Sequence, residues 1–216
     1  MMIRIESVSW KAGEFGLEDV SCEVPGGKYS VMMGRTGCGK TTLIELICGL
    51  RRPSSGRIFI GDRDVTYDPP GERGIGYVPQ DGALFPAMTV GAQIGFAMRL
   101  RGRPAEEVDG VIQRLSAELG IEALLERKPA GLSGGEKQRV ALGRALASEP
   151  KVMLLDEPLA ALDERTWSEM IDLLKRTQRE HGLTVLHVTH SRREAELLGE
   201  CVFRLEGGEV GDIGDL

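Results

Sequence analysis

The chain has 216 residues, of which 41% are hydrophobic and 28% are charged, and its formal net charge at pH 7 is −6. A chain of this size and composition is typical of a globular protein that needs no disulfide bonds or structural metal ions for stability. The four cysteines include no CxxC pair, which argues against a disulfide framework or a zinc site. The negative charge argues against nucleic acid as a partner, and no apolar stretch approaches the roughly 18 residues of a membrane span.

Strand-like runs recur along the whole chain, at 3–8, 29–33, 57–60, 75–78, 152–155, 184–188 and 202–205. Two of them, VMLLD and TVLHVTH, are almost wholly apolar, which favours the buried centre of a parallel sheet. The runs around 56–78 are separated by the turn-rich stretch GDRDVTYDPPGERG. This stretch favours an antiparallel side sheet.

Apolar residues at helical spacing predict helices at about 43–50, 108–119 and 167–174, with Gly182 placed to end the third. The segment from 86 to 149 lacks strand-like runs and is predicted to form an inserted helical lobe. Strands that alternate with helices indicate an α/β fold, here a mostly parallel sheet with an antiparallel β side sheet and the helical lobe. We therefore expect one domain over residues 1–216, with a core at 1–85 and 150–216 and a helical subdomain at about 86–149.

The stretch GRTGCGKTT at 34–42 lies between a predicted strand and a predicted helix and contains the pattern G-x-x-x-x-G-K-[ST]. Its glycines let backbone N–H groups turn towards phosphate oxygens, and the helix N-terminus adds partial positive charge. Lys40 is predicted to reach the β- and γ-phosphates of a nucleotide, and the Thr41 hydroxyl to bind Mg²⁺. Thr42 is either a further phosphate contact or a residue of the first helical turn. The predicted phosphate-binding residues are Gly34, Arg35, Thr36, Gly37, Cys38, Gly39, Lys40 and Thr41.

The stretch KVMLLDEP ends an apolar strand with two acidic residues, at the sheet edge where open α/β sheets bind ligands. Asp156 is predicted to hold Mg²⁺, directly or through water, and Glu157 to polarise an attacking water. His190 closes the run LHVTH. It either hydrogen-bonds a γ-phosphate or caps the strand, and the spacing does not choose between these roles.

A second glycine loop lies in LSGGEKQ at 132–138. Ser133 followed by Glu136 predicts a capping box that starts a helix, which continues until Pro150. A helix N-terminus with Gly134, Gly135 and a serine hydroxyl is also an anion site. Because the first loop already covers one side of its phosphates, the second loop suits the γ-phosphate held by another molecule.

Taken in order, GRTGCGKTT, the glutamine of YVPQ, LSGGEKQ, VMLLDEP, ALD and VTH resemble the nucleotide-binding subunit of an ATP-binding cassette (ABC) transporter, over essentially the whole chain. The resemblance implies a P-loop NTPase core that binds ATP and Mg²⁺ and acts as an ATPase. It also implies a head-to-tail dimer with a second copy, in which each ATP lies between one chain's phosphate loop and the other chain's LSGGE, so that Ser133, Gly134 and Gly135 contact nucleotide.

The same resemblance implies roles for single residues. Glu157 resembles the general base and Asp156 the Walker B metal residue. Gln80 resembles the residue that senses Mg²⁺ and contacts the membrane subunit. Asp163 resembles the residue that couples the two sites, and His190 the γ-phosphate contact.

The sequence departs from the family pattern at the adenine site and at two positions near the motifs. The family usually stacks adenine on an aromatic residue before the first core strands, and no tyrosine stands there. Phe15 in GEF, or Trp10, takes this role in our interpretation, since stacking on phenylalanine is physically adequate. Importer subunits often carry a histidine and an aspartate where this chain has Ala87 and Ser191.

Within the family, PPGERGIGYVPQDGALFP and LHVTH resemble importer ATPases of the molybdate, tungstate or sulfate type. This implies solute import, for example of an oxyanion such as molybdate, through a separate integral membrane permease, with a solute-binding protein as an indirect partner. It also implies a peripheral position at the cytoplasmic face of the cell membrane. Two alternatives stay open: an ABC ATPase that powers an exporter or another machine, and a stand-alone P-loop kinase, against which LSGGE and the acid pair argue.

Overall fold

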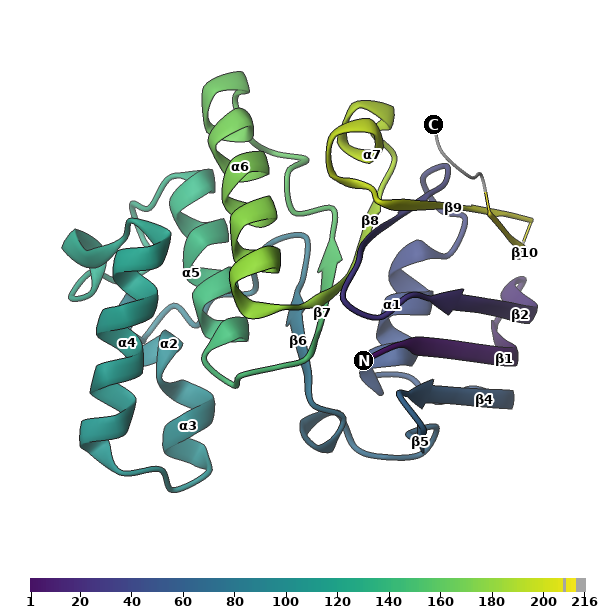
Figure 1. Ribbon diagram of the computed structural model, residues 1–216, viewed down its shortest axis with the longest axis horizontal. Helices are drawn as coiled ribbons and strands as arrows, with labels where there is room; N and C mark the ends of the chain where they lie inside the picture. Colours follow the sequence, from purple (N-terminus) through teal and green to yellow (C-terminus); the bar gives the residue numbers. More distant parts are fainter. Residues whose placement is uncertain (208, 213–216) are drawn as a thin grey trace.

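Two β-sheets organise residues 1–207 and 209–212, which this computed structural model describes (Figure 1). The smaller sheet is antiparallel, with the strand order β2-β1-β4-β5, and the larger has the order β10-β9-β3-β8-β7-β6. The smaller sheet consists of β1 (Ile3–Ala12), β2 (Phe15–Val24), β4 (Ser55–Ile60) and β5 (Arg63–Asp64). The larger sheet consists of β3 (Tyr29–Met33), β6 (Ile75–Val78), β7 (Val152–Asp156), β8 (Thr184–Thr189), β9 (Cys201–Glu206) and β10 (Glu209–Asp212).

The larger sheet is parallel except for β10, which pairs antiparallel with β9. Every residue of β7 and β8 is buried, as the two apolar runs predicted. Alternate side chains of β7 point to opposite faces of the sheet: Met153 and Leu155 belong to one apolar cluster, and Val152 and Leu154 to another. The predicted mostly parallel α/β sheet is confirmed.

Helices lie on both faces of the larger sheet. Helix α1 (Lys40–Cys48) lies between the two sheets, where Leu43 and Ile47 share an apolar cluster with β1, β2 and β4. The opposite face is covered by helices that include α6 (Glu164–His181) and α7 (Arg192–Leu198). As predicted, α6 ends at Gly182, whose φ of 60° is left-handed.

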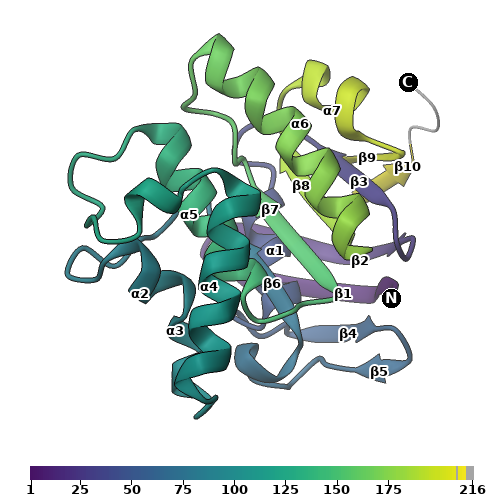
Figure 2. The same cartoon turned by 60° about the vertical axis from the view of Figure 1, so that its left-hand side comes forward.

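Residues 86–149 are helical, as predicted, and contain no strand. They form the end of the molecule away from the smaller sheet (Figure 1, Figure 2). Their buried side chains join the same apolar cluster as Met153 and Leu155, so the division into a core and a helical subdomain stays a prediction. The segment comprises α2 (Val90–Ile94), α3 (Phe96–Leu100), α4 (Ala105–Leu119), a 3-10 turn (Glu122–Leu124) and α5 (Gly134–Leu146).

Three details of the predicted elements are wrong. The run at 75–78 is not in the side sheet: β6 pairs in parallel with β7, and Gly76 lets it lie against Ala145 of α5. Strand β2 escaped prediction because bulges in its pairing with β1 interrupt the two-residue alternation of buried side chains. Leu50 is not part of a helix, since α1 ends before Gly49, whose φ is 80°, and Leu50 is 54% exposed.

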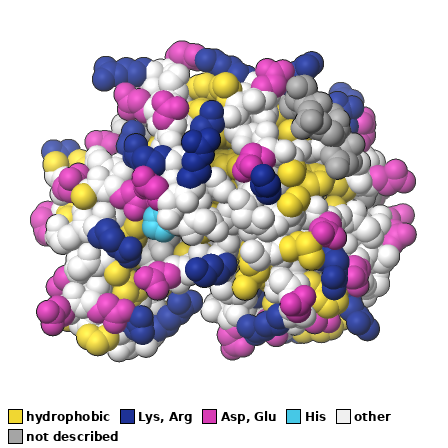
Figure 3. Space-filling model, in the orientation of Figure 1, with side chains coloured by type: hydrophobic (Ala, Val, Ile, Leu, Met, Phe, Trp, Pro, Cys, Tyr) yellow, Lys and Arg dark blue, Asp and Glu magenta, His cyan; other side chains and the backbone are white. Residues whose placement is uncertain are grey.

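The surface carries charges of both signs. Figure 3 shows acidic and basic side chains interspersed over one face of the molecule, with small apolar areas between them. Among the helices in the part of the chain that the structure describes, not one combines the length and the apolar character needed to cross a bilayer.

Candidate functional site

The first glycine loop connects β3 to α1 in a conformation that only glycine supports. Gly37 and Gly39 have φ angles of 82° and 108°, a region that L-residues rarely adopt. At Gly34 an added Cβ would lie 2.6 Å from Cys38 Sγ and 2.7 Å from the carbonyl oxygen of Leu205. The loop is therefore held close to β9, and α1 begins directly after it with its N–H groups directed at the loop.

Lys40 lies across this loop and is 5% exposed. Its Nζ donates to the carbonyl oxygens of Gly34 and Arg35, at 2.8 and 3.1 Å, and lies 3.7 Å from Glu157 Oε1. The ammonium group thus stands between the glycine loop and the acidic end of β7, where it can balance negative charge on a ligand.

The two predicted metal-binding residues meet at the end of the sheet. Thr41 Oγ1 donates to Asp156 Oδ1 at 3.2 Å, joining α1 to β7. Burial raises the pKa of the Asp156 carboxyl above its usual range, and the hydrogen bond from Thr41 offsets part of that rise. A hydroxyl and one carboxylate fit Mg²⁺, which keeps several waters and takes further oxygens from phosphates. Among the described residues, no group of three or more His, Cys, Asp or Glu side chains is placed to hold a metal ion.

Glu157 and His190 form a pair beside these residues. Glu157 has a φ of 42°, and its backbone N–H donates to the carbonyl oxygen of Val188 at 3.0 Å. A left-handed conformation costs a residue with a Cβ about 1–2 kcal/mol, so the surrounding turn holds this side chain in place. Glu157 Oε2 lies 3.0 Å from Nδ1 of His190, which follows β8 and is 55% exposed. The histidine therefore orients the carboxylate from the solvent side.

Lys40, Thr41, Glu157 and His190 share one cavity of about 510 Å³, and Asp156 is joined to it through its hydrogen bond with Thr41. Gln80 and Thr42 also line it, which favours the phosphate contact for Thr42 over a purely helical role. Ala160 lines it as well, and no motif pointed to this residue. The cavity is lined by Phe15, Thr36, Gly37, Gly39, Lys40, Thr41, Thr42, Gln80, Glu157, Ala160 and His190.

Phe15 and Trp10 differ in their surroundings. Phe15 is 39% exposed, lines the cavity, and lies close to Gly39 at the start of α1. Trp10 is not among the lining residues, and the guanidinium of Arg51 covers its ring at 4.7 Å from the centroid. The two rings contact each other at a centroid distance of 6.4 Å. The geometry favours Phe15 as the free stacking surface, and its role stays a prediction.

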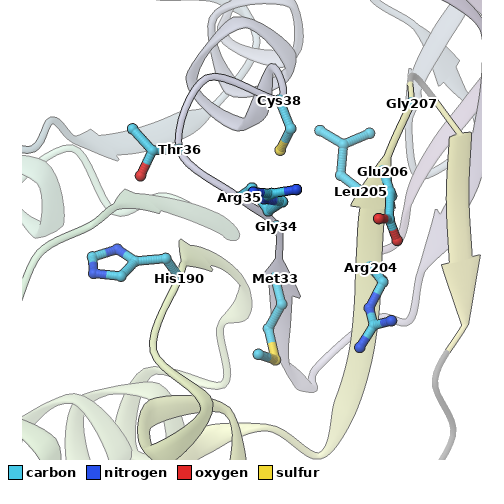
Figure 4. A pocket seen from close by; sticks show the side chains of 10 residues that line it. All are labelled: Met33, Gly34, Arg35, Thr36, Cys38, His190, Arg204, Leu205, Glu206 and Gly207. Atoms are coloured by element: carbon cyan, nitrogen blue, oxygen red, sulfur yellow. The ribbon is translucent and has the colours of Figure 1, made fainter.

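A second cavity, of about 740 Å³, opens on the other side of the glycine loop (Figure 4). Arg35 and Cys38 line it, with His190 on one side and Arg204 and Glu206 of β9 on the other. No sequence motif pointed to the β9 side chains. Their place next to the loop follows from the strand order, in which β9 is the neighbour of β3.

The second glycine loop does not line either of these cavities. Ser133 caps α5: its Oγ accepts from Glu136 N at 3.2 Å, and Glu136 Oε2 accepts from Ser133 N at 2.7 Å, which confirms the capping box. Gly134 and Gly135 form the first turn of α5, beside the start of α6; Gly134 is exposed and Gly135 is buried. Within one chain, neither of these two cavities therefore joins the two glycine loops.

Asp163 lies in the turn before α6 and caps that helix. Its carboxylate accepts from Thr166 N at 3.1 Å and from Thr166 Oγ1 at 2.7 Å. These hydrogen bonds lower the pKa of Asp163 below its usual range. The local geometry assigns Asp163 a capping role, and its predicted coupling role would require a second chain.

Comparisons with known proteins agree with this architecture. A family model described as "ABC transporter" matches residues 17–160. The molybdate/tungstate import ATP-binding protein WtpC of Thermococcus kodakarensis is 46% identical over 99% of this chain and 65% of its own length. WtpC of Archaeoglobus fulgidus is 44% identical over 88% of this chain and 79% of its own length. The chain thus spans just under two thirds of the first of these relatives.

Two solved structures share the fold. An ATP-binding cassette, solved as a dimer in a post-hydrolysis state with ADP and Pi, has a TM-score of 0.85 and 30% identity, covering 99% of this chain and 100% of that one. The protein cbiO1 of Clostridium perfringens, part of the ABC transporter complex cbiONQ, has a TM-score of 0.86 and 31% identity, covering 97% and 86% of the two chains. This chain belongs to the ABC transporter family.

Proposed function

We propose that this chain is the ATP-hydrolysing subunit of an ABC importer. The observation that carries the proposal is the convergence of Lys40, Thr41, Glu157 and His190 on one cavity at the carboxyl ends of the parallel strands, with Asp156 hydrogen-bonded to Thr41. These are the side-chain types that phosphoryl transfer from a nucleoside triphosphate requires.

Each residue has a distinct task in this proposal. Lys40 balances charge on the β- and γ-phosphates, and the N-terminus of α1 cradles them. Thr41 and Asp156 would hold Mg²⁺, with Gln80 lining the same cavity as Thr41, and the bound ion would supply further neutralisation of phosphate charge. Glu157 accepts a proton from the attacking water, whose oxygen bonds to the γ-phosphorus as the bond to the β-phosphate oxygen breaks. His190 positions the Glu157 carboxylate and reaches the γ-phosphate.

The test of this function is Glu157→Gln. The amide keeps the size of the side chain but cannot accept the proton, so we expect hydrolysis to fall about 10²–10⁴-fold while ATP binding is retained. Glu164→Gln is the matched control, because Glu164 lies a few residues further on and is 73% exposed, away from the cavity. Near wild-type hydrolysis by pure Glu157→Gln protein would remove Glu157 from this role.

The working unit in this proposal is a head-to-tail dimer that holds two ATP molecules. Two observations support it: the second glycine loop lies outside both cavities at the first loop, and a cassette of the same fold is described as dimeric with ADP and Pi. In the dimer, Ser133, Gly134 and Gly135 would cover the γ-phosphate held by the other copy, and Asp163 would lie near the shared site.

The transported solute is proposed from the relatives alone. Those reported above are named for molybdate and tungstate import, which supports an oxyanion, a separate membrane permease, a solute-binding protein and a peripheral position at the cytoplasmic face. A sugar is the competing solute, because the trehalose/maltose import ATP-binding protein MalK of Thermococcus litoralis is 41% identical over 95% of this chain and 57% of its own length. The chain should be purified with its membrane subunit in vesicles. ATPase stimulation by solute-binding protein loaded with molybdate or tungstate supports the oxyanion; stimulation by a sugar-loaded protein alone would refute it.

A further inference from the structure

Helix α5 is docked on the loop that carries Gln80. Gln138 Nε2 donates to the carbonyl oxygen of Gln80 at 3.1 Å. Less than two turns further along the helix, Arg144 donates from both terminal nitrogens, to the carbonyl oxygens of Ala83 at 2.7 Å and Gly82 at 2.8 Å. Gln138 and Arg144 are six residues apart, about 9 Å along the helix axis, and their long side chains both reach the loop. Three hydrogen bonds thus connect α5 to the backbone of residues 80–83.

The backbone of this loop is held in an unusual conformation. Gly82 has a φ of 70° and Ala83 a φ of 41°, and Asp81 Oδ1 accepts from Ala83 N at 3.0 Å. A left-handed conformation is unfavourable for alanine and persists only where its surroundings hold it. The two carbonyl groups converge on the single guanidinium of Arg144, which also lies over the ring of Phe85, 5.3 Å from its centroid. Arg144 therefore holds the turn in this shape together with Asp81.

Gln138 holds the other end of the loop from a buried position. It is 8% exposed, and its Oε1 has no protein partner among the described residues, so its amide donors make the contact to Gln80. The Gln80 side chain lines the cavity that contains Lys40 and Glu157. The backbone of Gln80 is thus attached to α5, while its side chain faces the nucleotide site.

The same helix starts at the second glycine loop. Ser133 and Gln138 are five residues apart, about 7.5 Å along the helix axis. An intact hydrogen-bonded helix transmits a displacement of its first turn to Gln138 and Arg144, which hold residues 80–83. These two side chains, which we call the clamp, therefore link the second glycine loop to the position of Gln80.

We propose that Gln138 and Arg144 are positioning residues. When the second glycine loop docks on nucleotide held by the other copy, they place Gln80 in this chain's own cavity. This inference rests on the proposed function, and it adds a connection between the two sites through α5 and the loop of residues 80–85.

Three variants and a matched control test the clamp. Gln138→Met removes the donor at similar volume, Arg144→Met removes both carbonyl contacts, and Arg144→Lys keeps the charge but lacks the planar fork that reaches two carbonyls. The control is Arg139→Met. Arg139 lies on α5 and donates to the carbonyl oxygen of Leu119 at 2.8 Å, so its loss removes a similar contact without touching the loop.

We expect kcat to fall about tenfold to a hundredfold in Gln138→Met and Arg144→Met, because small misplacements of catalytic groups have effects of this size. KM for ATP should stay within about twofold, since the phosphate loop is untouched. The Mg²⁺ concentration that gives half-maximal activity should rise. Arg144→Lys should lie between wild type and Arg144→Met, and Arg139→Met should keep kcat and the Mg²⁺ dependence of the wild type.

The decisive comparison uses a Gln80→Ala background. If the clamp acts through Gln80, Gln138→Met lowers kcat no further there. If Gln138→Met lowers kcat by the same factor with and without Gln80→Ala, and the wild type is active, the positioning role is overturned and the proposed function stands. Absence of Mg²⁺-dependent hydrolysis in the wild type would overturn the proposed function and the positioning role with it. If Arg144→Met fails to fold, Gln138→Met and Arg144→Lys carry the same test.

Discussion

Gly135 is required for the packing of α5 against α6, apart from its proposed contact with nucleotide. A Cβ at this position would lie closer to Thr166 Cγ2 on α6 than real Cβ atoms approach another heavy atom. Thr166 cannot turn away freely, because its Oγ1 donates to Asp163 Oδ2 at 2.7 Å. Overpacking of this kind costs about 1–3 kcal/mol, and the better helix propensity of alanine returns up to about 1 kcal/mol. We therefore expect Gly135→Ala to lower the free energy of unfolding by about 1–2 kcal/mol.

A second substitution, at Thr166, should remove the same clash from the α6 side. Thr166→Ser deletes Cγ2 and keeps the hydroxyl that bonds Asp163, so Gly135→Ala with Thr166→Ser should recover most of the lost stability. The interaction energy between the two substitutions should be about 0.5–3 kcal/mol. Urea unfolding followed by tryptophan fluorescence measures it, and Trp167 is adjacent in sequence to Thr166.

Gly110 provides the control for helix propensity, because an added Cβ there has no neighbour within 4 Å. Gly110→Ala should stabilise the protein by about 0.5–1 kcal/mol. If the effects of Gly135→Ala and Thr166→Ser simply add, the packing explanation is wrong. If the double variant is stable but inactive, Gly135 is also needed for close approach to phosphate, and stability and ATPase activity together separate the two reasons.

Two further predictions concern the adenine site and the surface for the membrane subunit. Phe15→Ala should weaken ATP binding roughly ten- to a hundredfold, since base–aromatic stacking contributes about 1–3 kcal/mol; unchanged affinity, with a loss in Trp10→Ala, would transfer the role to Trp10. In the run 84–90, residues 85–87 are exposed whereas Val90 is fully buried, so Ala87→Arg should uncouple transport in vesicles and leave basal ATPase activity largely intact. If Ala87→Arg lowers transport and ATPase activity equally, Ala87 has a structural role in the helical segment instead.

The elements that could be predicted from sequence are those whose local pattern and tertiary environment agree. The buried strands β7 and β8 and the amphipathic helices α4 and α6 are of this kind. Strand β2 is not, because bulges break its alternation. The placement of β6 depended on a partner 77 positions away, since Ile75 pairs with Val152, and no local pattern encodes such a pairing.

The candidate site also has features that could be predicted from sequence and features that could not. Motif spacing predicted most of the residues that meet in the cavity, because the motifs at 34–42, 80, 156–157 and 190 stand at or just after the ends of strands of the larger sheet, whose parallel strands end at one edge. The contacts between His190 and Glu157, and between Arg144 and the loop after β6, could not be predicted. They join residues 33 and about 60 positions apart through side-chain geometry alone.

The separation of the two glycine loops within one chain leads to a test with two inactive proteins. Lys40→Ala removes the charge at the phosphates, and Ser133→Arg blocks the second loop, so each homodimer has two defective sites. In a mixed dimer, one site combines both defects, and the other joins an intact phosphate loop to an intact LSGGE. We expect ATP-dependent dimers in the mixture, and hydrolysis if one intact site suffices. If both loops served the same chain's ATP, every site would keep one defect. A mixture of folded proteins that shows neither closed dimers nor recovered activity would therefore refute the shared site.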